Sequence, residues 1–393
     1  MERDKEMNKK EISEIKKQFT PEHCTITRIC GCYVDGEKDK KAELAQTFLT
    51  LTEEENFKYF TIFKGTLSGS IGKNLLNMEF PMEQEQPGGT QEFLMRLRNS
   101  KLEDTSLVEE FYDKVIETYH YDENYYIILV YAAYDVPGQT SDGIENDDAS
   151  DYVYDYILCS ICPVKLTDAG LAYNEHHNTI ESRIRDWVVG APNHGFLFPA
   201  FNDRNTDIHG LLYYTKNSET MQRDFIDRTL GCGAPLSYKA QQETFQDIIE
   251  NTLGDACDFE TVKTIQENLN EFAKEQQEVE EPAEIDKMQM KKLLEDSGVK
   301  HEVIENFDTA FDSIVAQEDK PTFSASNVAS TRSFDIKMPD VVIKVKPERT
   351  DLVETRMIDG KQYIVVEIND SVEVNGINVK TMDMETGEIL DES

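Results

Sequence analysis

Residue types that perform acid–base chemistry gather between Glu175 and His209. This stretch holds four of the seven histidines, and its candidates for chemistry are Glu175, His176, His177, His194, Asp203, Arg204, Asp207 and His209. On an extended backbone Asp207 and His209, two positions apart, point to the same face, as a general acid and base or a pair of metal ligands would require. A hydrolase or a metal-dependent enzyme would therefore have its site in this stretch.

No catalytic signature accompanies these side chains. The sequence around them contains no GxSxG nucleophile elbow, no HExxH zinc helix and no DxDxG loop. The alternative interpretation is that the polar groups brace irregular loops by hydrogen bonding, and we favour it. If the stretch does hold a site, we expect its residues among His194, Asp203, Arg204, Asp207 and His209. No cofactor and no metal ion is expected.

Two groups of residues have the spacing seen in metal sites or in disulfide-exchange motifs. Cys159 and Cys162 are three positions apart within a strand pattern, so their side chains should point to opposite faces and belong to the core. The other group, which could supply four zinc ligands, comprises His23, Cys24, Cys30 and Cys32. Because no second CxxC or HxxxH pair closes a tetrahedral site, we expect all seven cysteines to be reduced thiols without zinc.

The stretch Gly65–Asn74 has the outline of a phosphate-binding loop. Leu67 stands where the first glycine of the Walker pattern belongs, and Asn74 stands where the Mg²⁺-binding Ser or Thr belongs. We therefore expect these glycines to allow close helix packing instead.

Two helices expected over Asp286–Glu295 and Glu302–Val315 have the outline of a helix-turn-helix. The second of them contains acidic residues and no Lys or Arg, so DNA phosphates would repel it from the major groove. We expect this pair to pack against protein.

The chain is strongly acidic, with 77 acidic against 40 basic side chains and a formal net charge of −37. This charge repels nucleic acid and anionic membranes, so we expect neither as a direct partner and expect a basic protein instead. Between Lys101 and Tyr156 there are 15 acidic residues against two lysines, so binding at this face should weaken with salt. The N-terminal stretch is charged throughout and has no signal-peptide pattern, which favours the cytosol.

The two most apolar stretches, Tyr125–Tyr134 and Tyr152–Cys162, predict the central strand pair of a buried sheet. Both are too short to cross a bilayer as a helix, which needs about 20 apolar residues. We expect an α+β fold: an antiparallel sheet with flanking helices, a helical middle region and a small β-rich C-terminal module. The expected parts are an α+β domain over residues 1–234, a helical region over 235–318, a linker over 319–333 and a β-hairpin module with an acidic tail over 334–393.

Apolar spacing, caps and turn residues predict the other elements. Helices are expected over Lys9–Phe19, Lys40–Leu51, from Thr52 along a stripe to Leu75, Gln91–Arg98, Leu107–Ile116, Thr179–Val189, Glu219–Leu230, Gln241–Leu253 and Phe259–Gln277. Strands are expected over Thr25–Val34 and Leu211–Thr215 and, with turns at Asp359-Gly360 and Asn375-Gly376, after Phe334. Loops or irregular structure are expected over Pro137–Asp151, Pro192–Phe201 and Glu278–Glu284.

Three stretches of the sequence resemble an uncharacterised bacterial family, domain of unknown function 4317. They are MNKKEISEIKKQFTPEHCTITRICGCYVDGEK, FKGTLSGSIGKNLLNMEFP and FPAFNDRNTDIHGLLYYTKN, and the resemblance runs over nearly the whole chain. It implies no activity.

The order of the elements is also similar to that of the bacterial nucleoid-associated NdpA family. The similarity is one of layout, with scattered identities such as Tyr214 and Lys216. It implies a cytosolic, non-enzymatic and dimeric protein that works near the nucleoid. The acidic charge then favours contact with a basic DNA-handling protein, or DNA mimicry, over direct DNA binding.

Overall fold

A computed structural model describes residues 6–139, 145–175, 177–183, 185–277, 284–315, 322–330, 333–368 and 372–379. His176, the middle of the expected acidic loop, most of the expected linker around Pro282, part of the linker over residues 319–333 and the C-terminal acidic tail lie outside the described residues. The chain divides into a first unit that runs to Gln241 and a second unit that begins at Gln242. Each unit is described by itself.

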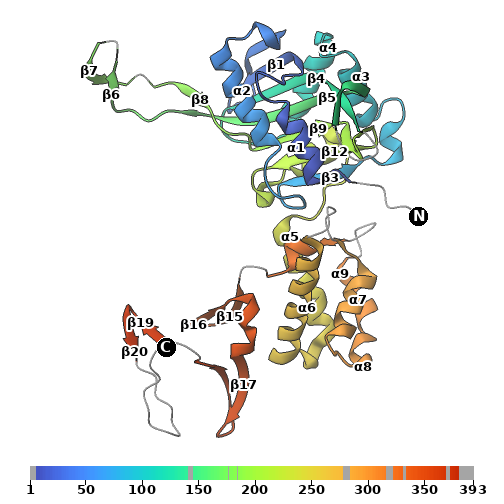
Figure 1. Ribbon diagram of the computed structural model, residues 1–393, viewed down its shortest axis with the longest axis vertical. Helices are drawn as coiled ribbons and strands as arrows, with labels where there is room; N and C mark the ends of the chain where they lie inside the picture. The colour runs from blue at the N-terminus through green and yellow to red at the C-terminus, as the bar shows by residue number, and fades with distance from the viewer. Residues whose placement is uncertain are drawn as a thin grey trace. The chain divides into compact units, whose positions relative to one another are not determined.

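An antiparallel sheet forms the centre of the first unit (Figure 1). Its strand order is β2-β1-β4-β5-β9-β12-β3, with β8 paired to the end of β5. The bounds are β1 Ile26–Val34, β2 Lys40–Thr47, β3 Leu75–Glu79, β4 Tyr125–Gln139, β5 Glu145–Leu166, β8 Trp187–Val189, β9 His194–Phe198 and β12 Gly210–Thr215. The two most apolar strands, β4 and β5, lie side by side at the middle, which confirms the predicted strand pair.

Both faces of this sheet are buried, which explains why its central strands are almost continuously apolar. Successive residues of β4 alternate between two cores: Ile127 and Leu129 belong to one, and Ile128 and Val130 to the other. The helices α3 Thr90–Asn99 and α4 Thr105–Thr118 and the π-helix η4 Phe225–Leu230 contribute to the first core. The helices α1 Lys9–Lys17 and α2 Glu53–Thr66 contribute to the second.

Local sequence signals set the ends of several helices. Asn8 opens α1 with a capping box, and the predicted Thr52–Glu55 capping box opens α2. Gly231 ends η4 with a φ of 78°, a left-handed conformation that favours glycine. The order of helices and strands as a whole confirms the predicted α+β class, with its antiparallel sheet, flanking helices and C-terminal hairpins.

Three predicted elements differ in the structure. Residues of the expected helix Lys40–Leu51 form the edge strand β2 and a 3-10 turn, because pairing with β1 outweighs the helix propensity of this polar stretch. The expected helix Thr179–Val189 forms β7 Thr179–Ser182 and β8 instead. Pro192–Phe201 contains β9 and β10 Ala200–Asn202 rather than irregular structure, and two prolines had hidden the short apolar strand between them.

The remaining differences concern element ends. The helix stripe predicted to reach Leu75 stops at Thr66, since Gly69 and Gly72 adopt positive φ values of 115° and 80° in the loop that follows. The predicted loop Pro137–Asp151 is narrower than expected, because β4 continues to Gln139 and β5 begins at Glu145. The helix expected over Glu219–Leu230 is shorter, as η3 Ser218–Thr220 precedes η4.

The second unit combines helices with β-hairpins. Its helices include α5 Tyr238–Leu253, which begins in the first unit, α6 Phe259–Gln277, α7 Lys287–Asp296, α8 His301–Ile304, α9 Phe307–Ile314 and α10 Ala325–Val328. Its paired strands are β13 Glu284–Ile285 with β14 Phe323–Ser324, β15 Phe334–Met338 with β16 Val341–Val345, β17 Val353–Ile358 with β18 Lys361–Val366, and β19 Val372–Val374 with β20 Ile377–Val379. The turns Asp359-Gly360 and Asn375-Gly376 have positive φ at both residues, so the predicted hairpin turns are confirmed.

Candidate functional site

His194 lies inside the first core, with only 3% of its surface exposed. Its Nδ1 is 2.9 Å from the Tyr119 hydroxyl, and its Nε2 is 3.0 Å from the carbonyl oxygen of Thr220. Because a carbonyl oxygen can only accept, Nε2 donates to Thr220 and Nδ1 accepts from Tyr119. Burial lowers the pKa of His194 to about 4, which keeps the ring neutral. Both ring nitrogens are thus used to join β9 to neighbouring elements.

Asp203 and Arg204 form the turn of the hairpin between β10 and β11 Asn205–Asp207, where both have positive φ. The guanidinium of Arg204 donates to both carboxylate oxygens of Glu14 on α1, at 3.1 and 2.9 Å. The backbone amide of Arg204 donates to Glu11, a buried carboxyl whose pKa is raised by burial. These bonds fasten the N-terminal helix α1 to the hairpin.

Asp207 and His209, near the end of the same hairpin, form hydrogen bonds with nearby residues. The Asp207 carboxylate accepts hydrogen bonds from the Asn202 side chain at 2.6 Å and from the His209 amide at 3.0 Å. The exposed His209 ring has its Nδ1 2.6 Å from a carboxylate oxygen of Glu85. This is the geometry of a braced turn, whereas the hydrogen bonds of His194 are made with Tyr119 and Thr220.

Glu175 and His177 lie at the tip of another hairpin, between β6 Leu171–Asn174 and β7. Both are exposed, and His177 contacts Glu181 at 3.6 Å. The candidates of this stretch are therefore distributed over the core, the β10–β11 hairpin and the β6–β7 tip. Among the described residues, no three His, Cys, Asp or Glu side chains converge as a metal site requires.

The cysteines follow the predicted strand faces. Cys159 belongs to the first core and Cys162 to the second, so the offset of three does separate them. Burial raises the pKa of both thiols. Cys30 and Cys32 share the first core, and burial raises the pKa of Cys32 to about 12. Such thiols are poor nucleophiles and poor metal ligands at neutral pH.

The loop within Gly65–Asn74 follows a helix rather than a strand. Asn74 donates to the carbonyl oxygens of Thr215 and Lys216 at 3.1 and 3.2 Å, which ties the loop to the end of β12. Lys73 lies 4.2 Å from the centre of the Tyr238 ring. The loop's polar side chains therefore serve packing, in contrast to a phosphate cradle.

Ion pairs join the two segments that were expected to form a helix-turn-helix. The expected second helix is broken into α8 and α9, and Asp308 of α9 lies 2.8 Å from Lys291 of α7. Lys287 of α7 lies 2.6 Å from Asp312. The charged side chains of α7 and α9 therefore pair with each other.

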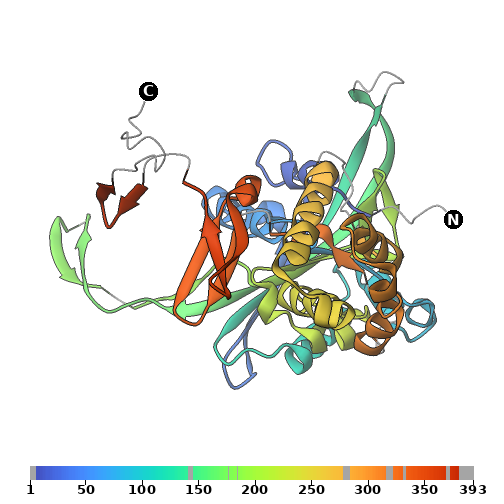
Figure 2. The same cartoon turned by 90° about the horizontal axis from the view of Figure 1, so that it is seen from below.

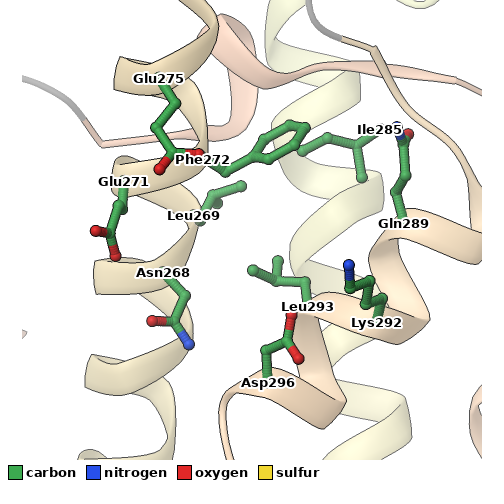
Figure 3. Close-up of a pocket in the computed structure, with 10 residues that line it drawn as sticks. All are labelled: Asn268, Leu269, Glu271, Phe272, Glu275, Ile285, Gln289, Lys292, Leu293 and Asp296. Atoms are coloured by element: carbon green, nitrogen blue, oxygen red, sulfur yellow. The ribbon is translucent and has the colours of Figure 1, made fainter.

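A pocket of about 530 Å³ lies between α6 and α7 in the second unit (Figure 3). In Figure 3 the Phe272 ring points from α6 toward Ile285, and Leu293 points back from α7. Ile285 and Leu269 are buried, whereas Phe272 and Leu293 are half-buried. The lining residues are Asn268, Leu269, Glu271, Phe272, Glu275, Ile285, Gln289, Lys292, Leu293 and Asp296. We call this site the α6–α7 pocket.

The charged side chains of the α6–α7 pocket are predominantly acidic. Glu271, Glu275 and Asp296 are exposed around it, against a single lining cation, Lys292. None of the ion pairs between described residues involves these four side chains. The pocket therefore offers an apolar floor within a negative rim.

Sequence reasoning missed this pocket because it used the apolar spacing of Phe259–Gln277 only to predict a helix. The available signal was the spacing of Glu271 and Glu275, one helical turn apart on either side of Phe272. Nothing in the sequence indicated that α7 would pack beside this face.

Comparison with known proteins identifies a family. The profile described as domain of unknown function (DUF4317) matches residues 7–377. No curated protein and no solved structure matches the chain. In the described part of the chain, no helix has the length and apolar character needed to span a membrane.

Proposed function

The chain belongs to the family of domain of unknown function 4317, and from this premise we propose that it is a non-enzymatic cytosolic interaction protein that holds a basic protein partner. The partner binds in the α6–α7 pocket, where it inserts an apolar side chain and places Lys or Arg beside the acidic rim. The observation that carries the proposal is the combination of a half-buried Phe272 and Leu293 with three exposed carboxylates.

The chemistry of the α6–α7 pocket selects for this partner class. A cavity of several hundred Å³ accommodates one or two large side chains. An apolar floor with a polar rim is the usual anatomy of a protein-binding hot spot. The net charge of −37 increases the association rate of cations and disfavours DNA, RNA and other acidic partners.

The cellular part of the proposal rests on the layout similarity to the NdpA family. We propose that the partner is a basic DNA-handling protein, so that the chain is associated with the nucleoid through protein contacts. We also propose that it acts as a homodimer. Direct nucleic-acid or membrane binding forms no part of this proposal.

The alternative, a hydrolase or metal-dependent enzyme, receives no support from the described geometry. His194 has a lowered pKa but lies sealed in the core, and His209 is exposed beside Glu85. A catalytic pair needs its groups within hydrogen-bonding reach of one substrate atom. The distribution of the candidates therefore favours the interaction protein.

A fluorescent peptide with three lysines around one leucine is a suitable probe for the pocket. Titrated with the full-length chain, it should bind at low salt and lose affinity steeply as salt rises. Glu271→Gln combined with Glu275→Gln should weaken binding about tenfold, since each exposed charge contributes about 0.5–1 kcal/mol.

Matched controls separate local recognition from net charge. Glu302→Gln with Glu305→Gln removes the same two charges from exposed positions of the same unit and should leave binding nearly unchanged. A peptide in which glutamate replaces lysine should not bind. Equal losses in both double variants, or binding that ignores salt, would contradict the proposal.

A further inference from the structure

The two helices that form the α6–α7 pocket run in opposite directions. At one end, the Asn268 side chain of α6 donates to the hydroxyl of Ser297, which directly follows α7, at 2.9 Å. At the other end, Ile285 lies just before the start of α7 and beside the Phe272 ring of α6 in Figure 3. The helices of the second unit, gold to orange, lie against one another in Figures 1 and 2.

Each helix lines the α6–α7 pocket over two turns. The lining positions show the same spacing of four and then three residues on both helices: Asn268, Phe272 and Glu275 on α6, and Gln289, Leu293 and Asp296 on α7. Such positions share one face of a helix. At about 1.5 Å per residue, the seven residues from Asn268 to Glu275 extend about 10.5 Å. The pocket therefore follows both helix axes for about two turns.

Contacts away from the pocket hold both of its walls in place. Lys274 of α6 pairs with Glu348 at 2.9 Å, and Lys291 of α7 pairs with Asp308 of α9 at 2.8 Å. The space between α6 and α7 is thus already formed in the chain alone. A partner that enters it does not have to order the two helices, a cost that would otherwise weaken binding.

The sign of the charge changes along the α6–α7 pocket. At the middle, Glu271 of α6 and Lys292 of α7 carry opposite charges. Glu275 and Asp296, which belong to different helices, lie at opposite ends in Figure 3, and both are exposed. A bound segment therefore meets a carboxylate at each end and an apolar floor with balanced charge between them.

A helix satisfies the demands of this pocket better than an extended segment does. The backbone groups of α6 and α7 beside the pocket bond within their own helices, so a strand would find no backbone edge to pair with. A helix satisfies its own backbone and packs its side chains between two other helices. Residues three before and four after an apolar residue lie on its face of the helix, about 10.5 Å apart. That separation matches the length of the pocket.

We propose that the partner of the α6–α7 pocket presents an amphipathic helix with one apolar anchor residue and two cations, one three residues before the anchor and one four residues after it. The inference rests on the proposed function and specifies the conformation and the charge spacing of its basic partner. The anchor packs on Phe272 and Leu293, and the two cations lie beside Glu275 and Asp296. A cation directly next to the anchor gains nothing, because Lys292 offsets Glu271 there.

Two peptides of identical composition test this spacing. Both contain one leucine and two lysines among alanine and glutamine. The spaced peptide has lysine three positions before and four positions after leucine, whereas the adjacent peptide has lysine on each side of leucine. Titrated with the full-length chain at low salt, the spaced peptide should bind about tenfold more tightly. Short free peptides are only partly helical, so circular dichroism should show that the spaced peptide gains helix on binding.

Variants at the two ends of the pocket test where the cations lie. Glu275→Gln combined with Asp296→Asn should remove the tenfold preference, so that the two peptides bind alike. The matched control, Glu302→Gln with Glu305→Gln, removes two charges from exposed positions outside the pocket lining and should keep the preference.

The outcomes separate this inference from the proposed function. Equal binding of the two peptides to the wild type, a preference that survives in the Glu275 and Asp296 variant, or a bound spaced peptide without added helix would overturn the helical partner alone. The same holds if neither peptide binds while the three-lysine peptide of the proposed function does. Failure of all three peptides to bind would overturn the proposed function, and this inference with it.

Discussion

Lowering the pH should destabilise the first unit through His194. The pKa of this side chain is 6.5 when exposed and about 4 in the folded chain, where burial disfavours the cation. The unfolded chain therefore binds the proton more readily, so stability falls as the pH drops from 6.5 through 4 and is unaffected by this group above 6.5. At about 1.4 kcal/mol for each pH unit, the full loss amounts to about 3 kcal/mol.

His194→Gln isolates this effect from the titration of the many carboxylates. The Nε2 of glutamine can still donate to Thr220, but the Tyr119 hydroxyl loses its acceptor. Urea unfolding at pH 7 should show the variant less stable by about 1–3 kcal/mol, the usual cost of an unmade buried hydrogen bond. At pH 4.5 the wild type should have lost about 2–3 kcal/mol more than the variant. Parallel losses in the two proteins would refute the assignment of a buried, neutral imidazole.

Three further outcomes follow from local geometry. Arg204→Lys keeps the charge but loses the two-point contact with Glu14, and should lower the free energy of unfolding by about 1–2 kcal/mol in urea titrations. Gly195→Ala would place a Cβ 2.3 Å from a carbonyl oxygen of the neighbouring strand and should cost about 2–3 kcal/mol, whereas Gly170→Ala, with open space around it, should cost under about 1 kcal/mol in the same assay. Cys257 is the exposed thiol among the seven, so a thiol reagent followed by mass spectrometry should label it first in the native chain; faster labelling elsewhere would contradict the burial pattern.

The central strands were predictable because their amino-acid composition is compatible with few structures other than a buried strand. Ten residues such as Tyr125–Tyr134, without a charge and rich in β-branched and aromatic side chains, are stable only in a covered sheet. Short-range signals also worked where a fixed geometry follows from residue type, as at Asn375-Gly376 and the Thr52–Glu55 box.

The errors arose where a distant partner decides the structure. The residues of Lys40–Thr47 suit a helix, but they form a strand because they pair with the edge of β1. His194–Phe198 is too short to show a period and is buried on both faces between β5 and β12.

The candidate sites show the same limit. A count of histidines and carboxylates between Glu175 and His209 carried no information on convergence, and the structure places His194 in the core and His177 at the β6–β7 tip. The α6–α7 pocket depends on the packing of two helices. Its acidic rim was visible in the sequence only as two glutamates among many.

Reversing the charge of Lys292 tests the central claim most directly. Lys292 is the single cation that lines the α6–α7 pocket, so Lys292→Glu should make the full-length chain bind the lysine–leucine peptide about 3–10-fold more tightly at low salt, with the gain lost at high salt. A variant that is partly unfolded would bind the peptide less tightly, so a gain in affinity cannot result from damage to the fold. Lys300→Glu, an equal charge change at an exposed position outside the pocket lining, should have little effect. Unchanged or weaker binding by Lys292→Glu, or an equal gain by Lys300→Glu, would contradict recognition of a basic partner at this pocket.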